Sequence, residues 1–585
     1  MIDQRLEKLL LKKHEESFED AIIKYLSKYG SATFDIEELY SNGLYLGDAP
    51  DLDFYGYMKL DCTICKNDEY SFKKSYQVTF KSNITNLDNI EIINVDEEFS
   101  IPFEVRLNTD FSRYMEDKDY DKLAKDFLEK YYPEAFDGIA IDVNKVLDRI
   151  GLNIEYKSIS ETGNTFAMIA FEDMTIKTYN WKDSLEYSIE DYDVKAKTIV
   201  MDDGVHELFQ DQYKDNFTKI HECVHEFKDK KYYFYNKLFN NSSAGVFCNV
   251  NKYDNESVKW IEIQANNITS RILMYKDTIE RKIEEYRKNN ELVDAYDYKY
   301  LFDYLRDYFK CSIQALKIRL LSLGYSEFSG IYDYIDGKYV EPYLSSESVA
   351  YDETYSIGLI NVALLELNPS FKNLLTNGMF IYVDSHICVN DDKYITMIDG
   401  ANHLSSLAWN DISTCCLKFK VTYKNNFNYS NMSFLRTANT VKPKYEFLVD
   451  GEYQEKYNLK ALKEQNKNIR KELSELPYDF GPALKKLMEN RKVTIEMLAS
   501  DANISEAQIK RLRNNEDQGT KPVTLVKICV GLQLPPMISR VLFKKKGFDL
   551  LQNTEQNILF NFVLDAMYKE NIHTVEERIK GYLDK

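Results

Sequence analysis

Long apolar runs are missing from this chain of 585 residues. None reaches the roughly 18 residues that a membrane-spanning helix needs. Residues 1–16 are charged and amphipathic, without the apolar centre of a signal peptide. Internal repeats and long low-complexity tracts are also missing, and the nine cysteines are odd in number and scattered, which suits a reducing compartment better than a disulfide scaffold. We therefore expect a cytoplasmic protein without membrane contacts.

Positive charge is scarce as well, since 75 Lys and Arg stand against 95 Asp and Glu and the net charge is −20. A surface this acidic does not coat nucleic acid along its whole length. Residues 481–550 are the exception, with 13 Lys and Arg, 7 Asp and Glu and a net charge of +6, which leaves −26 on the remainder. Any contact with DNA must therefore come from this locally basic segment.

The chain is too long for one hydrophobic core, so several domains are expected. Apolar positions at helical spacing predict a helix over residues 1–30, and alternation over residues 54–108 predicts strands. Further on, helices, then strands, then two more helices indicate an α+β domain. The predicted segments are an N-terminal accessory α+β region (1–112), a metallopeptidase domain (118–345), a mixed, β-rich region of unknown role (346–450), a charged helical connector (451–477), an all-α helix-turn-helix domain (478–550) and a helical tail (551–585).

One motif carries chemistry. His221 and His225 flank Glu222 in the pattern HExxH, on a predicted helix over residues 217–230. Positions four apart lie on one face of a helix, so both imidazoles can hold one metal ion. Zinc lowers the pKa of a bound water towards about 7, and Glu222 is placed to act as the general base. The alternative is a pair of histidines satisfied by solvent or by Glu226.

A catalytic zinc site needs a third protein ligand. The helix expected over residues 257–274 offers Glu262 and Asn266, which are four apart on one face. We predict Glu262 as the ligand and Asn266 as the hydrogen-bond partner of the far nitrogen of a ligating histidine. Glu256, at the edge of this helix, is the competing ligand. Residues 197–201 are our candidate for an exposed edge strand along which a peptide could add.

These residues resemble the ImmA/IrrE metallopeptidases, whose HExxH helix is followed by a second helix with the pattern E-x-x-A-N and a Leu-Met ending, here Glu262 to Met274. The resemblance covers residues 120–345 and extends more loosely over most of the chain. Two positions depart from the family. Tyr275 replaces the usual proline, and Gln264 replaces a second acidic residue, which leaves Glu262 as the acidic ligand.

The resemblance implies a gluzincin-like fold and a zinc endopeptidase, with Zn2+ held by His221, His225 and Glu262. It also implies a protein substrate, an Xre-type helix-turn-helix repressor, whose cleavage releases stress or mobile-element genes. The alternative function is a helix-turn-helix regulator that binds DNA or a partner and in which the peptidase fold is sensory or inactive.

The basic segment is expected to form five short helices, with Thr494 and Ser505 as N-terminal caps. Its pattern T-x-E-x-L-A-x-x-x-x-I-S-x-x-x-I-x-x-L resembles the Xre-type helix-turn-helix. That resemblance implies a helix in the major groove of double-stranded DNA. Residues expected to face bases are Ser505, Glu506 and Gln508, and those expected to face phosphates are Lys510, Arg511, Arg513 and Lys521. Acidic neighbours such as Glu516 leave protein recognition as the alternative.

Two cysteine groups remain. Cys62 and Cys65 form a lone CxxC, which favours packed thiols because no second pair follows at zinc-finger spacing. His386, Cys388, His403, Cys415 and Cys416 form a looser group, in which His386 and Cys388 share one face of a predicted strand. A second metal site there stays open.

Overall fold

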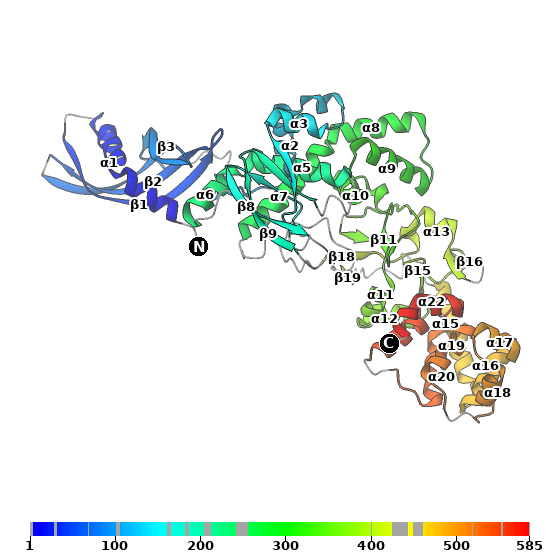
Figure 1. The fold of residues 1–585 in the computed structure, drawn as a ribbon. Coiled ribbons are helices and arrows are strands. Elements are labelled where there is room, and N and C mark those ends of the chain that lie inside the picture. Colours follow the sequence, from blue (N-terminus) through cyan, green and yellow to red (C-terminus); the bar gives the residue numbers. More distant parts are fainter. Residues whose placement is uncertain are drawn as a thin grey trace. The chain divides into compact units, whose positions relative to one another are not determined.

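The computed structural model describes residues 4–28, 32–67, 69–100, 106–160, 165–181, 187–203, 212–240, 256–350, 352–398, 401–423, 443–447, 460–516, 519–550 and 554–583. These residues form two compact units (Figure 1). The first unit comprises those up to Lys282 together with Arg306–Ser312, and the second comprises the rest. Among the helices described, none is long and apolar enough to cross a membrane.

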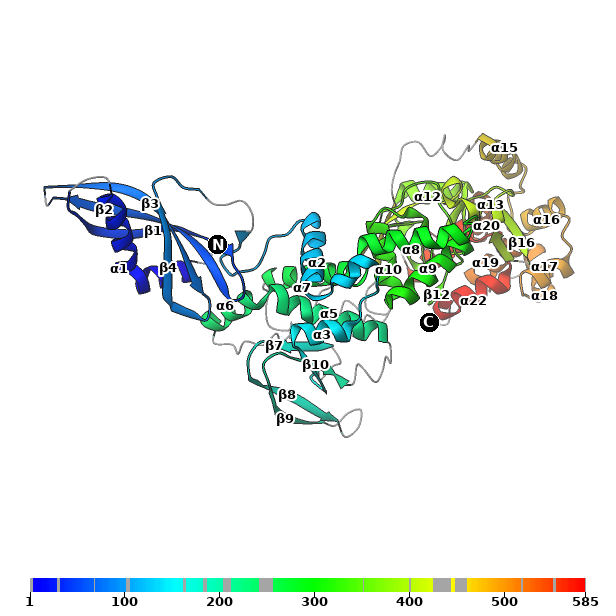
Figure 2. The same ribbon diagram turned by 90° about the horizontal axis from the view of Figure 1, so that it is seen from above.

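The first unit begins with a helix on an antiparallel sheet of strand order β4-β3-β2-β1-β5. The elements are α1 (Arg5–Ser27), β1 (Phe34–Asp48), β2 (Asp53–Lys66), β3 (Tyr70–Asn83), β4 (Asn86–Asp96) and β5 (Arg106–Leu107). Leu10 and Phe18 of α1 are buried with Phe54 and Phe80 of the sheet, and Figure 2 shows α1 lying along the long strands. The expected helix and strands are confirmed. The sequence did not predict β1, whose alternation is interrupted by two register shifts.

The rest of the first unit is an α+β arrangement around a three-stranded sheet of order β6-β10-β7. Its elements are α2 (Asp117–Tyr131), η1 (Pro133–Asp137), α3 (Val143–Ile150), β6 (Asn153–Lys157), β7 (Ala167–Ala170), β8 (Met174–Trp181), β9 (Tyr187–Val194), β10 (Thr198–Asp202), α5 (Gln212–Lys228), α6 (Lys230–Asn240) and α7 (Glu256–Leu273). α5 packs against both α7 and β7. This packing brings the two helices of the predicted metal site together.

The prediction that residues 197–201 form an exposed edge is wrong. β10 pairs in parallel with β6 and antiparallel with β7, so it is the central strand of this sheet. All five of its residues are buried. Its apolar residues 199–201 suit an interior position, and the buried Asp202 accepts hydrogen bonds from the N–H groups of Ile159 and Ser160 at 2.8 and 3.0 Å.

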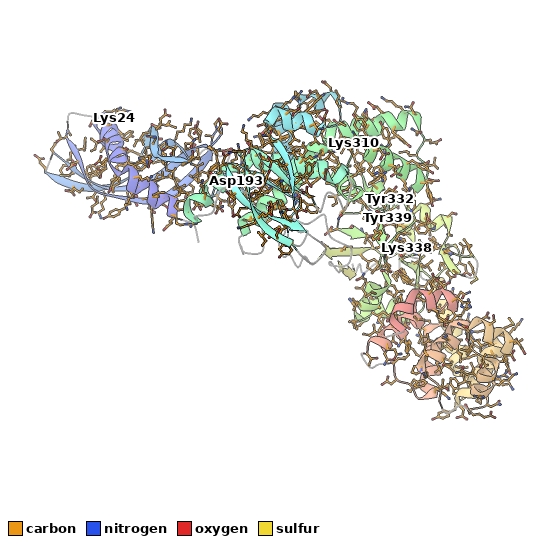
Figure 3. All side chains as sticks on the ribbon, in the orientation of Figure 1. Lys24, Asp193, Lys310, Tyr332, Lys338 and Tyr339 are labelled. Carbon is orange, nitrogen blue, oxygen red and sulfur yellow. The ribbon has the colours of Figure 1, made fainter. Side chains whose placement is uncertain are left out.

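The second unit combines helices with short hairpins. Its elements are α10 (Ile313–Ser322), η3 (Ser326–Phe328), β11 (Tyr334–Ile335), β12 (Lys338–Tyr339), β13 (Glu353–Thr354), α11 (Leu359–Leu365), α12 (Pro369–Thr376), β14 (Phe380–Val383), β15 (His386–Val389), β16 (Ile395–Ile398), β17 (Ala401–Leu404), α13 (Ser406–Asn410), η4 (Ile412–Thr414), β18 (Phe419–Tyr423), β19 (Pro443–Phe447) and α15 (Lys460–Ser474). α8 (Lys276–Asn289) and α9 (Ala295–Phe309) have residues in both units. The rings of Tyr332 and Tyr339, both labelled in Figure 3, pack edge to face with centroids 5.3 Å apart.

The C-terminal helices of the second unit are α16 (Phe480–Asn490), α17 (Ile495–Asp501), α18 (Glu506–Arg513), α19 (Pro522–Gly531), α20 (Pro536–Lys546), α21 (Glu555–Ala566) and α22 (Ile572–Leu583). The predicted caps are confirmed, since Thr494 Oγ1 accepts from Met497 N at 3.2 Å and Ser505 Oγ accepts from Gln508 N at 3.3 Å. Gly481 lets α16 approach α18, because a Cβ there would lie 2.4 Å from the carbonyl oxygen of Arg513.

The two units do not follow the expected segment boundaries. The N-terminal region and the HExxH helix fall in one unit, and the β-rich region, the helix-turn-helix and the tail fall in the other. Shared cores explain this division. A single apolar cluster joins the five helices α16–α20 to α21, α22, α11, α12 and the β14–β15 hairpin.

A buried carboxyl pair beneath these helices gives a stability prediction. Asp565 is paired with Arg540, whereas Glu366 Oε1 has no hydrogen-bond partner among the described residues. Burial, and then the charge of Asp565, raise the pKa of Glu366 well above its usual value, against Lys372 and Arg540. The stability that depends on protonated Glu366 is therefore complete below the usual pKa of a glutamate, and it is lost as pH rises towards the raised value.

We expect Glu366→Gln to raise the free energy of unfolding at alkaline pH by about 1–3 kcal/mol and to flatten its pH dependence. Thermal or denaturant unfolding between pH 5 and pH 9 measures both. Glu489→Gln, at an exposed position of α16, is the control. An unchanged pH slope in the Glu366 variant would contradict the assignment.

Candidate functional site

Three predicted ligands meet between α5 and α7. His225 Nε2 lies 2.9 Å from His221 Nε2, and Glu262 places its oxygens 3.1 Å from His221 Nε2 and 3.5 Å from His225 Nε2. Helical spacing puts the two imidazoles on one face of α5, and the packing of α7 on that face supplies the carboxylate. One ligand atom from each residue lies within 4.8 Å of the other two. Two nitrogens and one oxygen at this spacing can hold a metal ion.

Asp229 orients His225, a role that we had predicted for Asn266. The Nδ1 of His225 lies 2.8 Å from Asp229 Oδ2, which leaves Nε2 facing His221 and Glu262. The other histidine offers Asn266 no such role, since His221 Nδ1 has no partner among the described residues. The prediction for Asn266 is therefore wrong. The spacing of His225 and Asp229, four residues apart at the end of α5, was the available signal.

A charged chain supports this aspartate. Lys228 forms an ion pair with Asp229, and its Nζ donates to Gln264 Oε1 at 3.1 Å. Gln264 Nε2 in turn donates to the carbonyl oxygen of Arg113 at 2.6 Å. Burial opposes ionisation of Asp229, but Lys228 and His225 together lower its pKa. Asp229 is thus held as an anion behind the imidazole.

The three ligands form a strong cation-attracting set. Burial disfavours the charged form of His225, yet Glu262 and Asp229 outweigh it and raise its pKa to about 10. Burial also works against the Glu262 carboxylate, and the histidines overcome this effect and lower its pKa well below the usual range. Two facing imidazole nitrogens and a carboxylate therefore favour a positive charge between them, whether a proton or a metal ion supplies it.

Glu222 is the predicted base and lies beside this set. Its side chain is buried, and Oε2 has no hydrogen-bond partner among the described residues. Burial raises the pKa of Glu222, against the attraction of His225 and His221. Glu226 forms an ion pair with Lys230. The described contacts therefore do not support the alternative in which Glu226 satisfies the histidines. Glu256 is the first residue of α7, and its side chain lies outside the described part of the structure.

The lone CxxC lies on β2, where alternate residues face opposite sides of the sheet. Cys62 points into the core and is 3% exposed, and Cys65 lies on the other, half-buried face. Burial raises the pKa of the Cys62 thiol to about 12. This geometry does not let the two sulfurs share one ion, which matches the interpretation as packed thiols.

The second candidate surface is α18. Ile509 and Leu512 anchor this helix in the core, so that its remaining residues face solvent. Of the predicted contact residues, Ser505, Glu506, Lys510, Arg511 and Lys521 are exposed, and Gln508 and Arg513 are half-buried. Lys510 Nζ donates to Glu506 Oε2 at 3.3 Å, which ties one predicted phosphate contact to one predicted base contact. The turn before α18 contains Asn503 at φ +47°, and its side chain donates to Glu576 of α22.

A five-helix bundle with an exposed, basic second motif helix defines the helix-turn-helix class. The comparisons with known proteins agree, since residues 483–536 match the Cro/C1-type HTH DNA-binding domain. The HTH-type transcriptional repressor RghR of Bacillus subtilis is 38% identical over 56 residues, which are 10% of this chain and 42% of that repressor. No solved structure matches the chain. Residues 483–536 are therefore a helix-turn-helix domain of the Cro/C1 type.

Proposed function

We propose that this chain is a zinc-dependent endopeptidase of the ImmA/IrrE type that carries its own helix-turn-helix regulator domain. The observation that supports it best is the meeting of His221, His225 and Glu262 at one point, with Glu222 beside them. Two imidazole nitrogens and one carboxylate oxygen are the ligand set of gluzincin-type zinc sites. The buried support of His225 by Asp229 is also typical of a metal site rather than of a solvated helix face.

In this proposal each residue has a separate task. Zinc, when bound, supplies an acidified water and polarises the peptide carbonyl. Glu222 accepts the proton of the attacking water and delivers it to the leaving amine. Asp229 fixes the His225 tautomer, and Lys228 keeps Asp229 ionised.

The proposed substrate is an Xre-type helix-turn-helix repressor, and its cleavage would release stress or mobile-element genes. Two points support this choice: the resemblance of the HExxH region to enzymes that cut such repressors, and the presence of a related domain in the same chain. The domain of this chain would bring the peptidase to the repressor, either by binding double-stranded DNA or by pairing with the repressor directly.

Zinc content tests the metal site. We expect Glu262→Ala to hold about one zinc per chain fewer than the wild type, because a catalytic site binds one ion through three protein ligands. Asn266→Ala is the matched control, because it lies one turn further along α7 and does not contact the imidazoles. Metal analysis by mass spectrometry on the three proteins gives the answer. If Glu262→Ala retains all of its zinc, the third ligand is another residue, such as Glu256.

The orienting contact has its own consequence. Asp229→Asn keeps the shape but removes the negative charge behind His225, and we expect zinc affinity to fall about 10–100-fold. Competition with a chromophoric chelator measures the affinity. Glu226→Gln serves as control, because its carboxylate is paired with Lys230. Equal affinities in wild type and Asp229→Asn would show that the contact does not tune the site.

The second candidate function is a regulator that binds DNA or a partner while its peptidase fold senses a signal. The match of residues 483–536 to a DNA-binding domain favours it. A zinc-loaded protein that binds DNA but generates no new N-termini in a cell extract or in a panel of Xre-type repressors would favour this function over proteolysis.

A further inference from the structure

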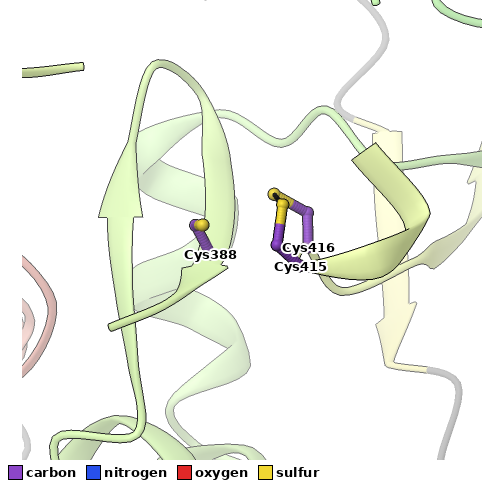
Figure 4. A group of neighbouring side chains, drawn as sticks. All are labelled: Cys388, Cys415 and Cys416. Atoms are coloured by element: carbon purple, nitrogen blue, oxygen red, sulfur yellow. Dashed lines mark hydrogen bonds between the residues drawn. The ribbon is translucent and has the colours of Figure 1, made fainter. Parts of the chain in front are cut away.

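Three cysteines of the second unit meet away from the helix-turn-helix surface. Cys388 lies on β15, and Cys415 and Cys416 follow η4; Figure 4 shows the three sulfurs turned towards one another. All three Sγ atoms lie within 4.8 Å of each other, and those of Cys415 and Cys416 are 3.8 Å apart. Each of the three side chains is 0% exposed.

The backbone holds these sulfurs in place. Cys388 and Cys416 are antiparallel bridge partners, Val389 N donates to Cys415 O at 2.8 Å, and Leu417 N donates to Ile387 O at 2.9 Å. The η4 turn adds a bond from Cys416 N to Ile412 O at 2.9 Å. Two segments far apart in the sequence thus fix three soft ligands at one point, which is the pre-organisation that a metal site requires.

The surroundings of these thiols are apolar, and two of the thiols donate to backbone carbonyls, Cys388 Sγ to Val389 O at 3.5 Å and Cys415 Sγ to Ile412 O at 3.7 Å. The neighbouring core is apolar and includes Ile381, Val383 and Ile412. His386 is not a fourth ligand, because its Nδ1 lies 2.7 Å from Asp384 O and its Nε2 lies 3.3 Å from Ser356 Oγ. Of the looser group that the sequence left open as a second metal site, the structure therefore brings together Cys388, Cys415 and Cys416 but not His386.

We propose that Cys388, Cys415 and Cys416 bind one soft metal ion, Zn(II) or Cu(I), through three thiolates. Sulfur ligands select these ions over harder cations. The site is independent of the His221–Glu262 set, because its ligands are sulfurs of the second unit. The bound ion would cross-link β15 to the segment that follows η4.

The test uses the full chain with His221→Ala and His225→Ala, so that the nitrogen–oxygen set cannot hold metal. Titration with Cd(II) under reducing conditions should give thiolate-to-metal charge-transfer absorbance that saturates at about one ion per chain. Cys388→Ser and Cys416→Ser should each abolish this signal. Cys62→Ser, which removes a buried thiol of the N-terminal sheet, should leave it unchanged. Metal analysis of anaerobically purified protein then identifies Zn(II) or Cu(I).

Several outcomes would overturn the proposal. Three-thiolate binding is excluded if Cd(II) gives no charge-transfer absorbance in the parent. It is also excluded if both Ser variants retain native circular dichroism and give the same absorbance as the parent. If the Ser variants do not fold, X-ray absorption at the cadmium edge of the folded, Cd(II)-loaded parent decides: a shell of three sulfurs supports the site, and a shell of nitrogen and oxygen alone refutes it. Because the parent lacks both histidine ligands, failure here does not bear on the peptidase.

Discussion

Replacing Glu222 by glutamine should leave zinc bound and reduce peptide hydrolysis by about 10²–10⁴-fold, the usual contribution of a general base. Glutamine matches the shape of Glu222 but cannot take a proton from water. The change also replaces a buried carboxyl that has an unpaired oxygen by a neutral amide, so folding should not suffer. Cleavage is measured by mass spectrometry of new N-termini in a peptide library, with zinc content determined on the same samples.

Glu226→Gln on the same helix is the control, because it changes an equally buried carboxylate that pairs with Lys230. It should cleave like the wild type. If Glu222→Gln retains full cleavage, Glu222 is not the base. If the wild type and both variants bind zinc but none of them cleaves, the result favours the regulatory function over proteolysis.

The triple variant of Lys510, Arg511 and Lys521 to glutamine should bind duplex DNA about 100-fold more weakly, which is about 2.7 kcal/mol and corresponds to a net contribution of about 0.9 kcal/mol for each of three contacts. These exposed side chains lie on α18 and at the start of α19. Each lost phosphate contact should also reduce the slope of log affinity against log salt by about 0.9. Fluorescence anisotropy with a random-sequence duplex at several salt concentrations measures both quantities.

A variant with the same charge loss elsewhere separates local from global effects. Lys8, Lys12 and Lys24 are exposed on α1, and their change to glutamine removes three positive charges far along the sequence (Lys24 is labelled in Figure 3). This control should lose little affinity. Equal losses in both triple variants would point to net charge alone, and no loss in either would assign α18 to protein recognition.

Local patterns carried most of the correct predictions. The spacing in α5 and α7 identified three residues that the structure brings together, because helical periodicity alone fixes which side chains share a face. The caps at Thr494 and Ser505 followed from short-range hydrogen bonding in the same way. Both cases depend on residues within a few positions of each other.

The predictions that failed had different causes. The central position of β10 results from pairing with strands before it in the chain, which its own apolar sequence does not specify. The prediction placed the support of the histidines on the facing helix, whereas Asp229 lies one turn beyond His225 in the same part of the chain. The sequence named Cys388, Cys415 and Cys416 only within a looser group of five residues, because no local pattern shows that the η4 segment returns beside β15.

The two compact units each combine several of the predicted segments. Composition marks the helix-turn-helix as a separate basic block, but Leu534 and Leu542 share a core with Phe562 and with Phe371 of the preceding region. Apolar burial, not charge, decides which segments fold together.

The β14–β15 hairpin has one consequence for handling the DNA-binding domain. Ile381 and Cys388 face one core, while Tyr382 and Ile387 face the core that also contains the helix-turn-helix. A fragment cut at residues 478–550 would leave the apolar side of its own bundle uncovered, and such patches promote aggregation. A piece that keeps both cores of the hairpin closed includes Tyr343 and Val349 and runs to the end of α22.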